Sequence, residues 1–228
     1  TVTISQEADG WYACSSCGDV PAQPLPSTGR ETGIDVGLKV FLIVADGEVV
    51  ENPRHYRKAE RRLAKVAKAQ RQVSRRKKGS QRRRKAVRLL ARAHQQVRRA
   101  RVDFYHKAAL ALLRQYDTIY LEELQVRTLV RNAHLAKSSS DAGWGAFRTI
   151  LAGKAAWAGK RVIAVSAQYT SQDCSGCGER VPKSLSVRTH VCPACGLVLD
   201  RDENAALNIL RAGQARQAST WPVAASVA

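Results

Sequence analysis

The chain has 228 residues and carries 38 lysine and arginine residues against 19 aspartate and glutamate residues, for a net charge of +19. It contains no apolar run of the ~20 residues that cross a bilayer, and no basic stretch followed by an apolar core at its start. A membrane-spanning or secreted protein is therefore not expected, and the length suits one α/β domain with a small appendage. The chain begins at Thr1 and contains no methionine, which favours a fragment or a gene that lacks its usual 5′ part.

The first part of the chain predicts a β-hairpin. Val2–Ser16 alternates around an Asp-Gly dipeptide, which is typical of a hairpin turn. Cys14 and Cys17 lie here without a matching second pair, so two reduced thiols are favoured over a metal site. A stretch rich in proline and glycine follows and predicts a linker.

The next segment predicts a buried strand that carries an acid. Thr32–Pro53 begins with an apolar strand, reaches a second turn at Asp46-Gly47 and returns in a short strand. Asp35 lies in the middle of the apolar strand, in GIDVG, where burying a carboxylate is costly unless a cation offsets its charge. Asp35 is therefore a candidate functional residue, and a turn residue is the simpler alternative.

Residues 54–115 combine a block of positive charge with a helical pattern. Of the 38 lysine and arginine residues, 21 lie between Arg54 and Arg101, beside a single acid. Because apolar residues recur at steps of three and four from Ala86 to Ala111, we expect an ordered helical hairpin, broken at KKGS, rather than a solvated linker. The charge favours a phosphate backbone as the partner. The residues expected to contact nucleic acid are Arg61, Arg62, Arg75, Arg76, Lys77, Lys78, Arg82, Arg83, Arg84 and Lys85.

Short β-rich and helical segments alternate in the remainder of the chain. In chain order they are a β-rich run at 117–123, a helix within 135–160, a strand at 161–169 and a helix at about 202–212. The signals for the first of these helices are Ser140-Asp141 as its cap and Gly159 as its stop. This order suits an α/β fold with a mixed sheet, a long basic helical-hairpin insertion and a small cysteine-rich insertion.

Two CxxC pairs predict a structural zinc site. CSGC and CPAC are separated by 14 residues, with glycine near each pair for a tight turn, as tetrahedral Zn²⁺ requires. The predicted ligands are Cys174, Cys177, Cys192 and Cys195, with His190 as a weaker competitor. A zinc ribbon is favoured over free thiols or an iron site, and the spacer leaves room for a small β-hairpin between the pairs. Four thiolates leave no open coordination position, so the ion would be structural.

Two further acids accompany Asp35. Glu122 lies near the end of the run TIYLEE, and Asp202 opens the last helix directly after the cysteine module. Taken singly, Glu122 could be a surface acid at a strand end and Asp202 an N-cap. Taken together, two carboxylates from neighbouring strands and a third from a helix start can meet at one end of a sheet and hold two Mg²⁺ ions. Two such ions would activate a water and stabilise the leaving oxygen of a phosphodiester.

The motifs GIDVGLK, YLEEL, TSQDCSGCG, CPACG and DRDENAALNI, in this order, resemble those of the TnpB (OrfB) family of transposon-encoded nucleases. The resemblance implies an RNase H-like (RuvC) domain with a zinc ribbon, which cuts DNA with Mg²⁺ under the guidance of a transposon-derived RNA. By motif, it assigns catalysis to Asp35, Glu122 and Asp202. Adjacent alternatives are Glu123 and Asp200.

The resemblance also sets the remaining expectations. The expected partners are DNA and a guide RNA. The expected location is the cytoplasm of a bacterium or archaeon, near the nucleoid. A monomer is expected, although no motif specifies the oligomeric state. A metal-dependent endonuclease is the leading hypothesis, and the alternatives are a nucleic-acid-binding remnant that does not cut and a transposase that performs strand transfer. Tyr105 and Tyr169 are expected to pack rather than to react. The expected domains are a remnant wedge hairpin at 1–20, a linker at 21–31, a nuclease domain at 32–170 and 198–213 with its helical insertion at 54–115, a zinc ribbon at 171–197 and a flexible tail at 214–228.

Overall fold

A computed structural model describes residues 1–18, 20–21, 24–37, 39–53, 70–123, 143–166, 168–184 and 187–220. The chain divides into two compact units. The first unit contains residues 1–23 and 53–107, and the second contains residues 24–52 and 108–228. Within the described residues, every helix is too short or too polar to cross a bilayer.

The first unit contains the predicted hairpin. Strands β1 (Val2–Gln6) and β2 (Trp11–Ser15) pair antiparallel, with Gln6 opposite Trp11, and the Glu7 N–H donates to the Gly10 carbonyl across the turn at 2.8 Å. The hairpin prediction is confirmed. It lies beside the helix that carries the positive charge, because the carboxylates of this turn bind arginines of that helix.

The basic segment of the first unit is helical where the structure describes it. Residues 70–75 are helical, and the chain then turns at Gly79, whose φ of 85° favours glycine, before α3 (Gln81–Gln115) begins. The break at KKGS is confirmed; residues 54–69, with Arg61 and Arg62, lie outside the described residues. The apolar stripe is only partly buried, since Ala86 and Ala108 are buried while Ala100 is exposed.

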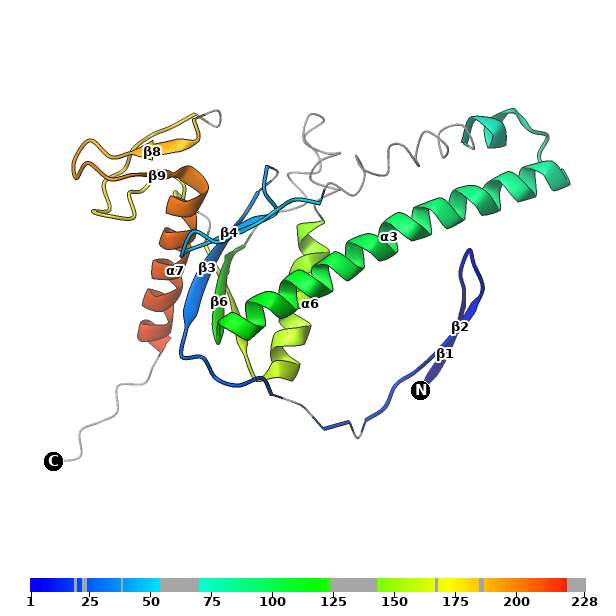
Figure 1. The fold of residues 1–228 in the computed structure, drawn as a ribbon, viewed down its shortest axis with the longest axis horizontal. Coiled ribbons are helices and arrows are strands. Elements are labelled where there is room, and N and C mark those ends of the chain that lie inside the picture. The colour runs from blue at the N-terminus through cyan, green and yellow to red at the C-terminus, as the bar shows by residue number, and fades with distance from the viewer. Residues whose placement is uncertain are drawn as a thin grey trace. The chain divides into compact units, whose positions relative to one another are not determined.

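A five-stranded mixed sheet forms the centre of the second unit (Figure 1). Its order is β5 (Val49–Val50), β4 (Leu42–Val44), β3 (Glu31–Val36), β6 (Thr118–Glu122) and β7 (Arg161–Val165). β3, β6 and β7 are parallel neighbours, whereas β4 and β5 run antiparallel. The expectation of an α/β fold with a mixed sheet is confirmed.

The long strand predicted before Asp46 is instead two strands. The chain reverses after Gly37, whose N–H donates to the Phe41 carbonyl at 3.2 Å, and β4 then pairs with β3 so that Ile34 lies opposite Val44. Both of these side chains are buried. An apolar run cannot reveal such a reversal, because each half satisfies the same hydrophobic pattern. The turn at Asp46-Gly47 is as predicted, with the Val44 N–H bound to the Glu48 carbonyl.

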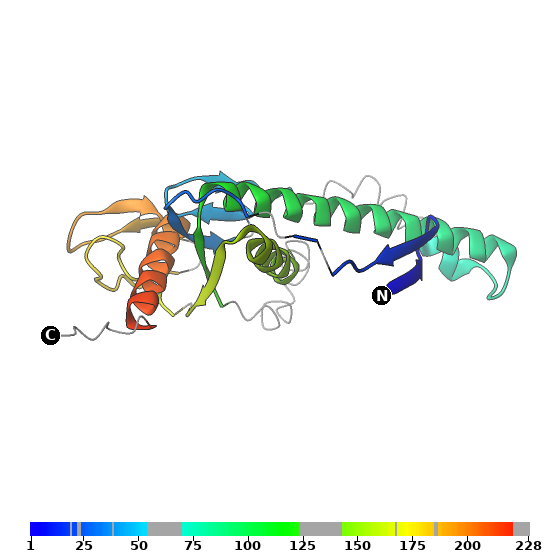
Figure 2. The ribbon, with the colours of Figure 1, turned by 90° about the horizontal axis from the view of Figure 1, so that it is seen from below.

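Two helices cover opposite faces of the sheet, α6 (Trp144–Ala158) on one and α7 (Arg201–Thr220) on the other (Figures 1 and 2). Gly159 ends α6 in a left-handed conformation, as predicted. The predicted start is wrong: α6 begins after Gly143, which is left-handed and makes no side-chain cap, and Ser140-Asp141 lie outside the described residues. Residues 214–220, expected in a flexible tail, are helical.

α7 lies very close to the sheet at two glycines. A Cβ atom on Gly33 of β3 would lie 2.2 Å from the Ala206 carbonyl oxygen of α7, and one on Gly213 of α7 would lie 2.0 Å from the Tyr120 ring of β6. Glycine is therefore required at both positions, because any larger residue would separate the helix from the sheet. Ala206 and Ile209 are fully buried in this contact.

The predicted linker is fixed in the second unit by a network around Asp117. The Asp117 carboxylate accepts hydrogen bonds from the Thr28 and Gly29 amides at 2.9 and 2.8 Å and from the Ser27 hydroxyl at 2.6 Å. It also pairs with the ammonium group of Lys160, whose side chain is 2% exposed. Lys160, together with these donors, holds the pKa of Asp117 well below its usual range. Residues 24–30 are thus an ordered part of the fold.

Gly33→Ala is expected to lower the free energy of unfolding by about 1–3 kcal/mol, because overpacking a tight contact forces the backbone to shift. Urea denaturation would measure the change. Gly153→Ala within α6 is the matched control, because a Cβ there meets no atom within 4 Å and alanine favours the helix by up to ~1 kcal/mol. Equal stability of the two variants would contradict the close contact of α7 with β3.

Candidate functional site

Asp35 and Glu122 lie side by side on neighbouring strands. In the parallel pair of β3 and β6, Gly33 lies opposite Tyr120 and Ile34 opposite Leu121, so the next step of the register places Asp35 beside Glu122. Side chains alternate between the faces of a strand. Since Gly33 and Tyr120 contact α7, the two carboxylates project on the face that α7 covers.

Asp202 approaches the same region from the start of α7. The N-cap position is occupied by Asp200, whose carboxylate accepts the Asp202 N–H at 2.8 Å. The alternative that Asp202 is the N-cap is therefore wrong. Asp202 is in the first turn of the helix and its Oδ2 lies 3.9 Å from where a Cβ on Gly37 would be, just beyond β3. Asp200 thus caps the helix, and Asp202 is the acid that faces β3. Glu123, the alternative to Glu122, lies at the strand end and is exposed.

The three carboxylates interact electrostatically. Burial raises the pKa of Asp35 well above its usual value, and the charges of Glu122 and Asp202 raise it further. Burial also raises the pKa of Glu122, while a hydrogen bond from Thr170 opposes that increase. These effects are those of carboxylates that are buried and, for Asp35, that lie close to other carboxylates.

Two arginines offset part of this charge. Arg201 contacts Asp202 Oδ1 at 3.0 Å, and Arg188 approaches Oδ2 at 3.4 Å. The carboxylates do not form a closed cluster: in the described part of the chain, the four cysteines are the only group of three or more His, Cys, Asp or Glu ligands with all ligand atoms within 4.8 Å of one another. The structure therefore brings Asp35, Glu122 and Asp202 to one region, but their carboxylate oxygens do not all lie within 4.8 Å of one another.

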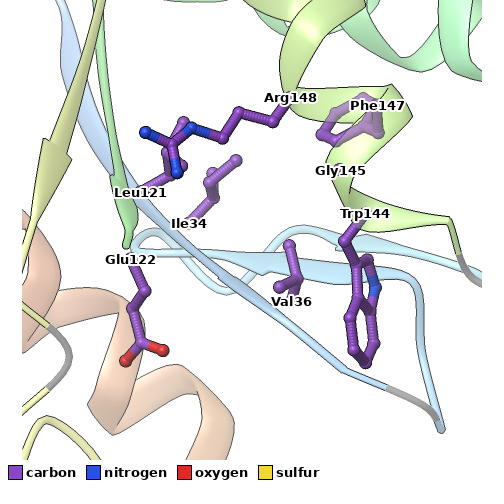
Figure 3. A pocket seen from close by; sticks show the side chains of 8 residues that line it. All are labelled: Ile34, Val36, Leu121, Glu122, Trp144, Gly145, Phe147 and Arg148. Atoms are coloured by element: carbon purple, nitrogen blue, oxygen red, sulfur yellow. The ribbon is translucent and has the colours of Figure 1, made fainter. Parts of the chain in front are cut away.

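A cavity of about 190 Å³ lies on the opposite face of the sheet, beneath α6 (Figure 3). Ile34, Leu121, Trp144 and Phe147 contribute to its largely apolar lining. Glu122 lies at its edge, but in Figure 3 the carboxylate points away from Arg148 and toward α7. The cavity and the carboxylates are thus on different sides of the sheet.

The four predicted cysteine ligands come together. The sulfur atoms of Cys174 and Cys195 are 3.6 Å apart, as are those of Cys177 and Cys192. A tetrahedral ion with Zn–S bonds of 2.3 Å requires S···S separations of about 3.8 Å, so the four sulfurs fit a metal ion such as Zn²⁺. Disulfides are excluded, because all four cysteines are free. Cys14 and Cys17 also carry free thiols.

The hairpin of the cysteine module spans the second CxxC pair rather than the segment between the pairs. Strands β8 (Thr189–Val191) and β9 (Val198–Asp200) flank Cys192–Cys195, and the Cys192 N–H donates to the Leu197 carbonyl at 2.9 Å. The spacer leaves room for a hairpin of its own, but in this hairpin the turn of the second CxxC pair joins the two strands. His190 is buried on β8 and contacts Lys183, outside the four-sulfur group.

Asparagines of α7 connect this helix to the chain beside the first CxxC pair, a feature that sequence reasoning missed. Asn204 donates to the Asp173 carbonyl at 2.8 Å and accepts the Ser175 N–H at 2.9 Å, which fixes the chain on either side of Cys174. Asn208 donates to the Asp173 carbonyl at 2.6 Å and to the Thr170 carbonyl at 2.8 Å. The run ENAALN gave a signal, since Asn204 and Asn208 lie four apart on one helix face.

Tyr169 begins this turn and is not a simple packing residue. It is 48% exposed, its φ is 61°, and the Arg180 guanidinium lies 3.5 Å from the centre of its ring. Tyr169 thus packs against Arg180 at the surface, whereas Tyr105 is buried.

Two groups of basic residues are prominent in the described part of the first unit. Arg98 and Arg99 of α3 pair with Glu7 and Asp9 of the hairpin at 2.6 Å each, and Gln95 also donates to both acids. The hydrogen bond from Gln95, with Arg99 and Tyr12, lowers the pKa of Asp9 to about 2. The second group makes no ion pair with an acid of the described chain and is exposed or half-buried. It contains Arg75, Arg76, Lys77, Lys78, Arg82, Arg83, Arg84 and Lys85.

Comparison with known protein families gives two matches. The sequence profile of the OrfB family of IS605 elements, described as "Probable transposase", matches residues 6–133, which is more than half of the chain. The profile of the Cas12f1-like TNB domain matches residues 144–209, which include the cysteine module and most of the first half of α7.

Individual relatives agree with these profiles. A candidate RNA-guided DNA endonuclease of Streptomyces pristinaespiralis is 42% identical over 221 residues, covering 96% of this chain and 54% of the relative. The candidate RNA-guided DNA endonuclease InsQ of Escherichia coli K12 is 32% identical over 230 residues, covering 94% and 56%. The chain thus spans about half the length of these relatives.

A solved structure shares the fold. The structure of a Cas12f1–guide RNA–target DNA complex matches with a TM-score of 0.58 and 16% identity, over 92% of this chain and 55% of that protein.

Purified chain is expected to contain about one zinc ion per molecule, and Cys192→Ser to contain much less, because a structural zinc site depends on all four thiolates. Elemental analysis would measure the metal content. Cys14→Ser is the matched control, since Cys14 is an exposed thiol outside the four-sulfur group. Full zinc content in Cys192→Ser would contradict the assigned ligands.

Proposed function

Because the chain belongs to the OrfB family of IS605 transposon proteins, we propose that it is the catalytic part of a TnpB-type, RNA-guided DNA endonuclease with an RNase H-like (RuvC) nuclease domain. The observation that carries the proposal is the placement of Asp35 beside Glu122 at the ends of two parallel strands, with Asp202 facing them from α7. The mixed sheet, with helices on both faces, is compatible with such a domain.

The donor atoms of these three side chains fit Mg²⁺, which prefers carboxylate oxygens. Burial of Asp35, together with the nearby charges of Glu122 and Asp202, raises the pKa of Asp35, and a divalent cation bound here would offset that shared negative charge. When bound, such ions would activate a water and stabilise the leaving oxygen of a phosphodiester. The residues contribute by fixing the carboxylates: β3 and β6 set Asp35 and Glu122, and the Asp200 cap fixes the start of α7.

The cysteine module would hold one structural zinc ion through Cys174, Cys177, Cys192 and Cys195. Its connection to α7 through Asn204 and Asn208 supports a role in holding the helix that carries Asp202. The exposed basic residues around the start of α3 would bind the phosphates of DNA and guide RNA.

Asp35→Asn is expected to reduce Mn²⁺- or Mg²⁺-dependent DNA cleavage by more than the roughly 10- to 100-fold that follows loss of a group beyond the metal ligands. Cleavage would be measured on plasmid DNA with purified chain, with and without transposon-end RNA. Glu123→Gln is the matched control and is expected to cut normally, because Glu123 is exposed beside Glu122.

Three results would contradict this proposal. Cleavage that survives Asp35→Asn would exclude the three-acid site, and salt-sensitive binding without any cleavage under either condition would favour a binding remnant. Joined transposon ends produced by the chain alone would favour strand transfer, in agreement with the description of the family as a transposase.

The triple variant Arg82→Ala, Arg84→Ala, Lys85→Ala is expected to weaken binding to duplex DNA and to reduce the slope of log affinity against log salt. The reduction would be up to ~2.7, since each lost phosphate contact removes about 0.9. Fluorescence anisotropy at several salt concentrations would measure it. The control removes three exposed charges of the second unit. It consists of Lys39→Ala, Arg114→Ala and Arg211→Ala. An equal slope change in both variants would contradict a specific role for the α3 start.

A further inference from the structure

Thr170 makes a direct contact with one of the three carboxylates. Its side-chain hydroxyl donates a hydrogen bond to Glu122 Oε1. Thr170 is 7% exposed and lies in the turn between β7 and the first CxxC pair. A buried hydroxyl that donates to a carboxylate restricts the rotation of that carboxylate and specifies which of its oxygens is engaged.

The position of Thr170 is itself fixed from two sides. The Thr170 carbonyl accepts a hydrogen bond from the Asn208 side chain at 2.8 Å, and Asn208 also binds the Asp173 carbonyl at 2.6 Å. On the other side, Tyr169 has the left-handed φ of 61°, a costly conformation for a bulky residue. Its carbonyl accepts the amides of Gln172 and Asp173 at 2.8 and 2.9 Å. The turn is therefore held in one conformation by α7 and by its own hydrogen bonds.

We propose that Thr170 is a positioning residue that orients Glu122 for binding a divalent cation. This inference rests on the proposed function, in which Glu122 is a metal ligand. The hydrogen bond engages Oε1 and leaves Oε2 for the cation. Glutamate has a flexible side chain at the end of β6, and neighbouring acids repel it, so a fixed donor is needed to keep the carboxylate directed toward Asp35 and Asp202 in the absence of the ion.

The turn that contains Thr170 connects Glu122 to α7, which is a different role from that of the four cysteines. Thr170 reaches Glu122 on β6, whereas Asn208 belongs to α7, the helix that also carries Asp202. Hydrogen bonds through Thr170 and Asn208 therefore join Glu122 on β6 to the helix that carries Asp202. Loss of the Thr170 hydroxyl would free Glu122 without removing any ligand or any part of the core.

The test is Mn²⁺ binding by the zinc-loaded chain of 228 residues, measured by electron paramagnetic resonance of the free ion. Thr170→Val, which keeps the shape of the side chain but removes the donor, is expected to bind Mn²⁺ roughly tenfold more weakly. Thr170→Ser, which restores the hydroxyl, is expected to recover most of the affinity, a rescue that a purely structural role would not produce. Thr170→Ala provides a second hydroxyl-free variant if Val does not fit the turn.

Thr149→Val is the matched control. Its hydroxyl binds only a helix carbonyl, of Gly145, on the exposed side of α6, so its Mn²⁺ affinity should equal that of the wild type. Zinc content and melting temperature establish that each variant is folded.

The outcomes separate this inference from the function on which it rests. If Asp35→Asn loses Mn²⁺ binding while Thr170→Val and Thr170→Ala bind as the wild type does, the positioning role is wrong and the three-acid site stands. If Asp35→Asn binds Mn²⁺ as tightly as the wild type, or the wild type binds none, the three-acid site is wrong and the role of Thr170 fails with it.

Discussion

The close contact between α7 and the central strand is the constraint on which the second unit depends. At Gly33 the backbone of β3 meets the backbone of α7 directly, and at Gly213 the helix accepts the Tyr120 ring in the space where a side chain would be. Two glycines thus allow an approach that buries Ala206 and Ile209 completely. Without it, Asp202 would move away from the strand that carries Asp35. The distance between a helix and a sheet here controls the distance between carboxylates.

The same helix explains why a cysteine module precedes the acidic helix start. The second CxxC pair closes the β8–β9 hairpin, which ends at Asp200, the N-cap of α7. Asn204 and Asn208 then bind the turn before the first pair. The module is therefore fixed to α7 on both sides of the four-cysteine group. The module restrains the rotation of α7 about its axis and the position of its first turn. Contact with the sheet through apolar side chains alone would restrain both less strongly.

Local signals in the sequence predicted much of this arrangement. The Asp-Gly turns, the CxxC spacing and the apolar strands each depend on residues close in the chain, and the structure contains all of them. The reversal after Gly37 and the continuation of α7 past Ala212 were missed for a common reason. A glycine in an apolar segment gives the same sequence signal whether it ends a helix or strand or allows another side chain to pack closely against it. Only the residue that packs there shows which case applies, as Tyr120 does at Gly213. Thr170 was missed likewise, since its partner Glu122 is 48 residues away.

The order of the three carboxylates along the chain has a consequence for biosynthesis. Asp35 and Glu122 lie on strands that can pair as soon as residue 122 has left the ribosome, whereas Asp202 follows only after the cysteine module. Chains emerge from the amino terminus and domains close when their last element arrives. During translation the strands therefore hold two of the acids before the third is available. The three carboxylates meet only once α7 has been synthesised and has docked on the sheet.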